Sequence, residues 1–238
     1  DGTIYLENLR SALQTDTYIM KGADEGEEFR PHFTFHGFQY IEISGLDYMP
    51  SLDDITGFVK YSACRQTGSV ETSNAMVNKL FSNAMWGQIG NFVGVPTDCP
   101  QRDERMGWTG DAQVFCRTAA INYDVKKFFK KWLGDMAIEQ RADGAVAGVV
   151  PEINQKWDGT FRTRISAAWG DAGVIVPWTV YEMTGDKTIL TENYESISRY
   201  MHWLSTQQER VDTILYTLIG AGTATGDWLS YAPIESRY

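Results

Sequence analysis

Four consecutive segments between residues 111 and 208 set the architecture, because fully apolar segments alternate with segments that are apolar on one face. The apolar ones are AQVFCRTAAINY, which follows Asp111, and Ala167–Met183. The amphipathic ones are VKKFFKKWLGDMAIEQR, which follows Asp124, and Ile189–Gln208. A helix that is apolar all round is buried, whereas an amphipathic helix lies at the surface. The alternation therefore predicts helical hairpins wound into a two-layer ring, with each inner helix covered by its outer partner.

Local signals predict where these helices begin and end. Asp111 and Asp124 are placed to cap the first and second of these helices. In the third helix, Pro177 predicts a kink or a late start, and Gly185 is placed to end it. An earlier helix is predicted to follow Ser73 as its N-cap. The inward face of the second helix is predicted to hold Val125, Phe128, Phe129, Trp132 and Met136. That of the last is predicted to hold Tyr194, Ile197, Met201 and Leu204.

The first 64 residues follow a different pattern. Apolar and polar residues alternate around Phe33 and Phe35 and along Tyr40–Ile43, with glycines between the runs. This pattern is typical of antiparallel strands and predicts part of a β-sandwich. The pattern changes over residues 65–72, which is the candidate domain boundary. We therefore expect a mainly α chain, with a β-sandwich segment over residues 1–68 and a helical domain over residues 69–238.

Charge and composition exclude several classes of function. The net charge is −10 without a basic run, which argues against nucleic acid as a partner. The sequence contains no run of about 18 apolar residues, so no membrane-spanning helix is predicted. Three cysteines without CxxC spacing are expected to be free thiols, and His32 and His36 have no third ligand nearby, so no metal site is predicted. The chain begins with Asp-Gly, and we expect it to be a piece of a longer protein. Its cellular location and oligomeric state are not indicated.

The most polar stretch, Pro96–Asp111, lies just before the alternating helices. Two prolines limit its backbone while two glycines allow tight turns. Carboxylates beside an aromatic ring are what sugar cleavage needs, because one acid must protonate the leaving oxygen. A solvated loop that ends in a helix cap would have the same composition. The charged and aromatic residues of the stretch are Asp98, Arg102, Asp103, Glu104, Arg105, Trp108 and Asp111.

Two later loops repeat the combination of Gly, Asp and Trp. They are Trp169–Gly170–Asp171 and Gly226–Asp227–Trp228, and each lies near a predicted helix start. In a ring of hairpins these loops would meet at one end. A helix cap beside a core tryptophan explains either loop alone, but the recurrence favours a carbohydrate pocket, in which indole faces pack on sugar C–H groups.

The sequence DCPQRDERMGWTGD, followed by AAWGDAGVIVPW and TGDWLS, resembles the catalytic domain of α-L-rhamnosidases of glycoside hydrolase family 78. The β-rich segment resembles the sandwich domain that precedes that family's barrel. The resemblance implies that residues 69–238 are the N-terminal part of an (α/α)6 barrel that hydrolyses terminal α-L-rhamnose with inversion. It implies a rhamnose-containing glycoside or oligosaccharide as substrate, and no metal or organic cofactor.

The resemblance also implies roles for individual residues. Glu104 matches the general acid, while the sugar would be held by Asp98, Trp108 and Asp111, with Trp169 and Trp228 as aromatic walls and Arg102 as a partner for the sugar or a carboxylate. Reasoning from charge, nearby carboxylates would raise the pKa of such an acid and nearby arginines would oppose them. Adjacent side chains cannot aim at one atom, so Asp103 is expected to point away into a structural contact.

Inversion needs a second carboxylate roughly 6.5–9.5 Å from the first. The resemblance implies a glutamate much later in the chain, and the surroundings of Glu235 do not match it. A ring of six hairpins needs about twelve helices, of which about half are visible here. We therefore expect the base and the remaining helices beyond Tyr238. Two alternatives stay open: an (α/α)6-barrel exo-glycosidase specific for another sugar, and a non-catalytic carbohydrate-binding relative.

Overall fold

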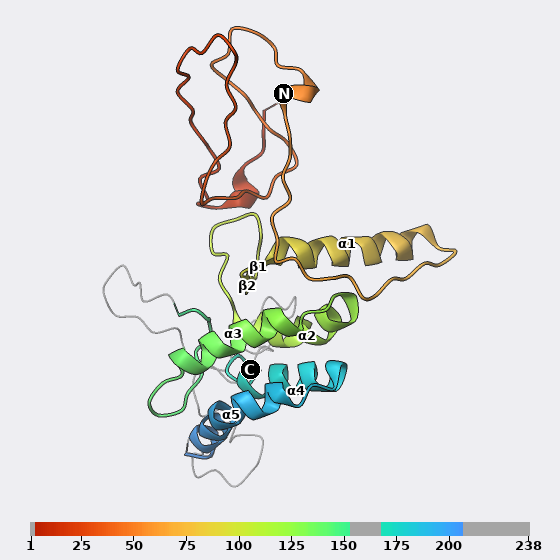
Figure 1. The fold of residues 1–238 in the computed structure, drawn as a ribbon, viewed down its shortest axis with the longest axis vertical. Helices are drawn as coiled ribbons and strands as arrows, with labels where there is room; N and C mark the ends of the chain where they lie inside the picture. The colour runs from red at the N-terminus through yellow and green to blue at the C-terminus, as the bar shows by residue number, and fades with distance from the viewer. Residues whose placement is uncertain (1–2, 153–167, 207–238) are drawn as a thin grey trace, which may run out of the picture.

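The computed structural model describes residues 3–152 and 168–206, and its ribbon is shown in Figure 1. Two short 3-10 helices, η1 (Glu7–Leu9) and η2 (Leu52–Asp54), lie in a group of loops that precedes the helical part. The remaining elements follow in the order α1 (Ala75–Asn91), β1 (Phe92–Val93), β2 (Val95–Pro96), α2 (Thr109–Asn122), α3 (Lys126–Glu139), α4 (Ala172–Thr184) and α5 (Thr188–Thr206). The described part is therefore mainly helical, as expected. None of its helices has the length of apolar sequence that crossing a membrane requires.

The N-terminal segment lacks the strand pairing that its sequence pattern predicts. No strand is assigned within residues 3–74. Phe33, Tyr40 and Ile41, which the alternation places in or beside strands, are exposed. An alternating pattern reports that one face of a strand is suited to burial, but a ladder also needs a neighbouring strand. Within the described residues 3–74 no such neighbour pairs with it.

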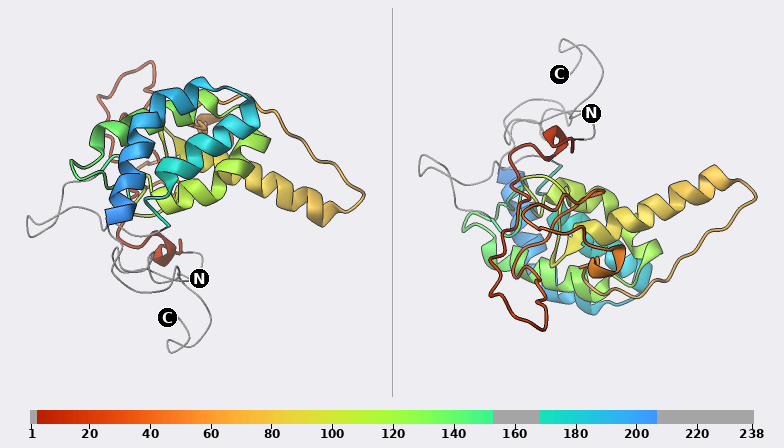
Figure 2. Two further views of the ribbon diagram at one scale, coloured as in Figure 1. Left: turned by 90° about the horizontal axis from the view of Figure 1, so that it is seen from below. Right: turned by 90° about the horizontal axis from the view of Figure 1, so that it is seen from above.

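Helix α1 begins one residue later than predicted. Its cap is Asn74 rather than Ser73, since the Asn74 side chain accepts a hydrogen bond from the Met76 amide at 2.9 Å. The helix extends away from the others and ends at a two-stranded turn, in which Phe92 pairs with Pro96 (Figure 2). Gly94 closes this turn with a φ of 80°, which favours glycine. The turn leads the chain directly into the polar loop.

The other four helices form two layers, as the alternation predicts. Helix α2 packs on α4, and α3 packs on α5, while α4 also contacts both α3 and α5 (Figure 2). An aromatic cluster joins α3 to the end of α1, because Phe92 stacks on Phe128 with ring centroids 4.3 Å apart. The largest fully buried side chains of these helices include Phe129, Trp132, Leu133, Val176, Val180, Ile189 and Tyr200.

The inward face is correct for α3 and only partly correct for α5, on which the predicted Leu204 packs against the core. Every residue predicted to face inward on α3 is buried, namely Val125, Phe128, Phe129, Trp132 and Met136. On α5, Tyr194 and Met201 are exposed, and the buried residues are Ile189, Asn193, Tyr200 and Trp203. Two of these buried residues are polar and are therefore not found by apolar periodicity, and one of them bonds to another element. Tyr200 Oη donates to Asp171 Oδ1 at 2.8 Å, and Asn193 Nδ2 donates to the Ile189 carbonyl at 2.7 Å.

Helices α2 and α4 are not buried all round among the described residues. Val114 on α2 and Trp178 on α4 are 81% and 51% exposed.

Helix α2 begins at Thr109, so Asp111 lies in its first turn and is not its cap. Helix α4 starts at Ala172 and contains Pro177, and Gly185 ends it in the left-handed conformation, as predicted.

Candidate active site

The polar loop between β2 and α2 is closed by one aspartate. The Asp98 amide donates to the Met106 carbonyl at 3.1 Å, and the Met106 amide donates to Asp98 Oδ1 at 3.0 Å. This pair of bonds brings residues 98 and 106 together and leaves the Asp98 side chain 7% exposed. Asp98 therefore shapes the loop, in addition to any contact that it makes with a ligand.

The C-terminal end of the loop is fixed to the segment that follows α3. Trp108 forms a bridge with Val149, and the Val150 amide donates to the Gly107 carbonyl at 2.9 Å. A Cβ atom at Gly107 would lie 2.0 Å from the Val150 carbonyl oxygen, so this approach requires glycine. These contacts set the position from which the Trp108 side chain extends.

Glu104 is the residue around which the loop's side chains gather. Trp108 Nε1 donates to Glu104 Oε1 at 2.7 Å, and Arg102 Nη1 donates to Glu104 Oε2 at 2.5 Å. The side chain of Glu104 is 23% exposed, so it is held and still reachable. Its φ is 114° and that of Arg105 is 52°. Such angles cost non-glycine residues of the order of 1–3 kcal/mol each and are concentrated at functional sites.

Arg102 links two of the predicted site carboxylates. Besides Glu104, its guanidinium lies 3.4 Å from Asp98 Oδ2. The hydrogen bond to Glu104 raises the pKa of Arg102. Arg102 therefore serves the carboxylates of the site as a charged partner.

Asp103 and Arg105 point to the other side of the loop. Asp103 Oδ2 accepts a hydrogen bond from Ser11 Oγ at 2.8 Å, which confirms the expected structural contact. Arg105 Nη1 donates to the Phe35 carbonyl at 2.7 Å, and its guanidinium lies 4.8 Å from the Phe35 ring centroid. Sequence reasoning missed these partners, since residues 11 and 35 carry no signal that relates them to a loop so far along the chain.

A hollow of about 600 Å³ lies beside the loop and brings together Asp98, Asp111 and Trp169. Glu104 and Trp108 are not among its lining residues, so the predicted site falls into two groups that share Asp98. Trp228 lies outside the described residues. The hollow is lined by Ala84, Gly87, Gln88, Asn91, Phe92, Pro96, Thr97, Asp98, Gly110, Asp111, Ala112, Gln113, Val114, Phe115, Ala168 and Trp169.

Trp169 is positioned by the turn that precedes α4. Asp171 Oδ2 accepts a hydrogen bond from the Ala168 amide at 3.1 Å, and Asp171 Oδ1 accepts the Tyr200 hydroxyl. The indole packs so closely on α2 that a Cβ atom at Gly110 would lie 2.7 Å from its ring. Its Nε1 is buried and has no hydrogen-bond partner within the described chain.

Asp111 projects from the first turn of α2 at the edge of the hollow. It retains accessible surface but is partly enclosed by its neighbours. This partial burial raises the pKa of Asp111, and the negative charges of Asp98 and Glu104 add to the effect. These surroundings therefore disfavour the negative charge of Asp111, to an extent that its exposure to solvent reduces.

The same loop contains one group of metal-ligating atoms, from Asp98, Cys99 and Glu104, which lie within 4.8 Å of one another. The Arg102 guanidinium already contacts both carboxylates of this group. Burial also raises the pKa of the Cys99 thiol, which disfavours the thiolate that a metal needs. The chemistry of this donor set fits a fixed cation from Arg102 better than a metal ion.

Comparison with known proteins assigns the family. Residues 65–237 match the model of the bacterial alpha-L-rhamnosidase six-hairpin glycosidase domain. The chain belongs to this family. Residues 1–61 match the concanavalin-like domain of bacterial alpha-L-rhamnosidases, so the N-terminal segment is of the expected kind although its described residues form no strands.

Relatives of the family are similar over nearly the whole chain. The chain is 44% identical to an alpha-L-rhamnosidase of Streptomyces avermitilis over 97% of its length, and 42% identical to one of Formosa agariphila over 98%. A crystal structure of the Streptomyces avermitilis enzyme, complexed with L-rhamnose, superposes with a TM-score of 0.82 over 96% of this chain, at 43% identity. The chain spans 21% and 24% of the lengths of these two relatives, so it represents about a fifth of proteins of this kind.

Proposed function

We propose that the protein containing this chain releases terminal α-L-rhamnose from glycosides or glycans by inverting hydrolysis, with Glu104 as proton donor. The observation that carries the proposal is the fixed carboxyl of Glu104 beside a hollow that holds two carboxylates and an indole. In the same proposal, residues 1–68 belong to a β-sandwich and residues 69–238 to the N-terminal part of the (α/α)6 barrel.

The position of Glu104 suits a general acid. Catalysis by proton transfer depends first on geometry, because the acid must lie within hydrogen-bonding reach of the leaving oxygen. Trp108 and Arg102 hold one carboxyl oxygen each, and the remaining exposed surface is open to a substrate. Glu104 would then donate its proton to the glycosidic oxygen as the bond to the sugar breaks.

The hollow provides chemistry suited to the sugar itself. Carboxylates of Asp98 and Asp111 accept hydrogen bonds from hydroxyl groups, and the Trp169 face packs on C–H groups. Trp108 would complete the apolar wall on the Glu104 side, and Trp228 is proposed as a wall residue from outside the described part.

The general base is not assigned to Asp98. An oxygen of Asp98 lies within 4.8 Å of an oxygen of Glu104. Inverting pairs are roughly 6.5–9.5 Å apart, which leaves room for water. The proposal therefore leaves this role to a carboxylate outside the described residues.

A panel of 4-nitrophenyl glycosides, assayed with the whole protein, tests the specificity. The α-L-rhamnoside should be cleaved and the other sugars should not. Preferential cleavage of another glycoside would favour the alternative of a related exo-glycosidase. Rhamnose binding without turnover of any substrate would favour a non-catalytic carbohydrate-binding protein.

Glu104→Gln tests the proposed acid. The amide keeps the size of the side chain and removes its acidic proton, so turnover of a rhamnosyl disaccharide should fall by roughly 10²–10⁴-fold, with only a modest change in binding. Initial rates and calorimetric titration with rhamnose measure the two effects. Near-normal turnover would remove Glu104 from this role.

A further inference from the structure

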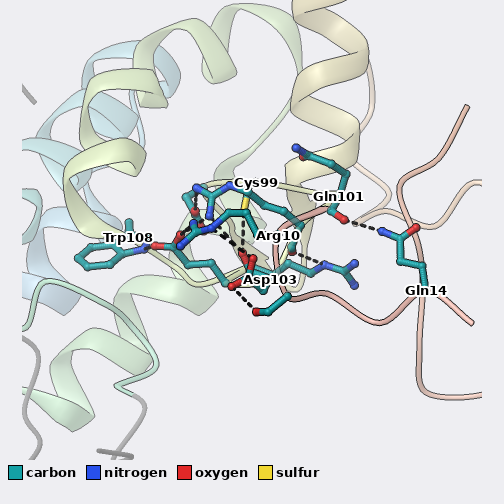
Figure 3. A network of polar contacts seen from close by, with 11 residues as sticks. Arg10, Gln14, Cys99, Gln101, Asp103 and Trp108 are labelled. Carbon is teal, nitrogen blue, oxygen red and sulfur yellow. Dashed lines mark hydrogen bonds and ion pairs between the residues drawn. The ribbon is translucent and has the colours of Figure 1, made fainter. Parts of the chain in front are cut away.

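The loop that carries Glu104 is held from outside by the N-terminal segment, as Figure 3 shows. Gln14 Nε2 donates to the Gln101 carbonyl at 2.5 Å, and Ser11 Oγ donates to Asp103 at 2.8 Å. Arg105 Nη1 donates to the Phe35 carbonyl at 2.7 Å. These contacts come from two separated parts of the segment, near residues 11–14 and at residue 35.

The contacts alternate along the loop. Residues 101, 103 and 105 face the N-terminal segment, whereas Arg102 and Glu104 face the site. Glu104 lies between Asp103 and Arg105 in the chain, so contacts that fix these two neighbours restrict the direction of the residue between them. The outer contacts therefore help to set where Glu104 points, and they oppose relaxation of the positive φ angles at residues 104 and 105.

One residue of the N-terminal segment contacts both sides of the loop. Arg10 Nε lies 3.5 Å from Asp103 Oδ1, and Arg10 Nη1 lies 3.5 Å from Glu104 Oε2. The Arg10 side chain is 57% exposed, so the pairs contribute little to stability. A planar guanidinium nevertheless fixes the relative directions of two carboxylates better than a single charge does. The other charged groups near Glu104 are Arg102 and Asp98.

We propose that Arg10, supplied by the segment that precedes the helical domain, is a positioning residue for the proton donor. It bridges Glu104 to Asp103, which Ser11 holds, and so aligns the donor's carboxyl with the leaving oxygen. The inference rests on the proposed function, because it presupposes that Glu104 donates a proton. It assigns to the N-terminal segment a part in the chemistry of the helical domain.

The test compares substrates that differ in their need for an acid. The leaving group of 4-nitrophenyl α-L-rhamnoside departs readily without a proton, whereas the sugar alkoxide of a rhamnosyl disaccharide requires one. In the whole protein, Arg10→Met should lower kcat for the disaccharide on the order of tenfold and that for the nitrophenyl glycoside by less than about twofold, with little change in KM. Arg65→Met is the matched control, because it removes another exposed arginine–aspartate pair, 3.9 Å from Asp124, and it should change neither rate.

Equal losses on both substrates, or no loss on either, would overturn the positioning role. If Arg10→Met does not yield folded protein, Arg10→Lys is compared on the same two substrates. Lysine keeps the positive charge but lacks the planar guanidinium that contacts two carboxylates. Glu104→Gln, measured in parallel, separates the two proposals. If Glu104→Gln loses more activity on the disaccharide than on the nitrophenyl glycoside and Arg10→Met does not, only the role of Arg10 is rejected. If Glu104→Gln shows no such difference between the substrates, the proposed acid is rejected.

Discussion

One charged residue of the site, Asp111, is expected to have opposite effects on folding and on ligand binding. Partial burial and the nearby carboxylates raise the pKa of Asp111. A group whose pKa is higher in the folded state binds more protons there. It stabilises the fold at pH values below its unfolded pKa of about 3.8, and this contribution is lost as the pH rises through the folded pKa.

Asp111→Asn is therefore expected to raise the melting temperature at neutral pH and to weaken rhamnose binding. The amide removes the costly charge and also removes a strong acceptor for sugar hydroxyls. Thermal melts between pH 3 and pH 8 should show a gain that disappears below about pH 4. Calorimetric titration with rhamnose measures the loss of affinity.

Glu195→Gln provides the control for net charge, since it removes one exposed negative charge from α5. It should leave rhamnose binding unchanged. A melting temperature for Asp111→Asn that is lower than that of the unsubstituted protein at neutral pH would contradict the account of this residue.

Helices position the tryptophan wall through close contact between elements. The first turn of α2 approaches the turn before α4 so closely that Gly110 has no room for a side chain. Gly110→Ala should displace the Trp169 indole from the hollow and weaken rhamnose binding by about tenfold, which corresponds to about 1.4 kcal/mol. Calorimetric titration gives the affinity, and the change in tryptophan fluorescence on adding rhamnose should diminish.

Gly134→Ala is the matched control for this prediction. Gly134 is a helical glycine of α3 with no atom near its missing Cβ, so alanine should raise helix stability by about 0.5–1 kcal/mol and leave binding unchanged. Equal rhamnose affinity in the two variants would show that Trp169 does not depend on Gly110.

At the level of elements, sequence periodicity predicts the helices and their two layers but not every face. Apolar spacing is sufficient for α3, whose buried residues are all aromatic or aliphatic. It is only partly correct for α5, where the polar residues Tyr200 and Asn193 are buried and hydrogen-bonded. For the N-terminal segment the family match agrees with the predicted kind of domain, but the strands are not formed within residues 3–74, because pairing depends on neighbours that the pattern of a strand does not specify.

The candidate site was predictable where its residues lie close in sequence. Asp98, Arg102, Glu104 and Trp108 form one network because hydrogen bonds within and at the ends of a short loop bring them together. The contacts of Arg10 and Ser11 were not predictable, because they depend on how two distant parts of the chain pack. The division between the Glu104 network and the hollow likewise follows from packing, which no local pattern encodes.

Across the whole molecule, the polar loop is one of the places where the N-terminal segment meets the helical part (Figures 1 and 3). The segment contacts its outer side, Glu104 faces the inner side, and α2 continues from its end. The family match covers both parts of the chain, with residues 1–61 and 65–237 assigned to different domains of bacterial alpha-L-rhamnosidases. Because the loop contacts both domains, the way in which the N-terminal segment packs on the helical part affects the direction of the Glu104 carboxyl.

The most direct test is a crystal structure of the whole protein with Glu104→Gln and an uncleaved rhamnosyl disaccharide. The account predicts that the side chain at position 104 lies roughly 2.6–3.2 Å from the glycosidic oxygen, with the terminal sugar against Trp169 and beside Asp98 and Asp111. A glycosidic oxygen outside the reach of position 104, with another acid beside it, would contradict the account.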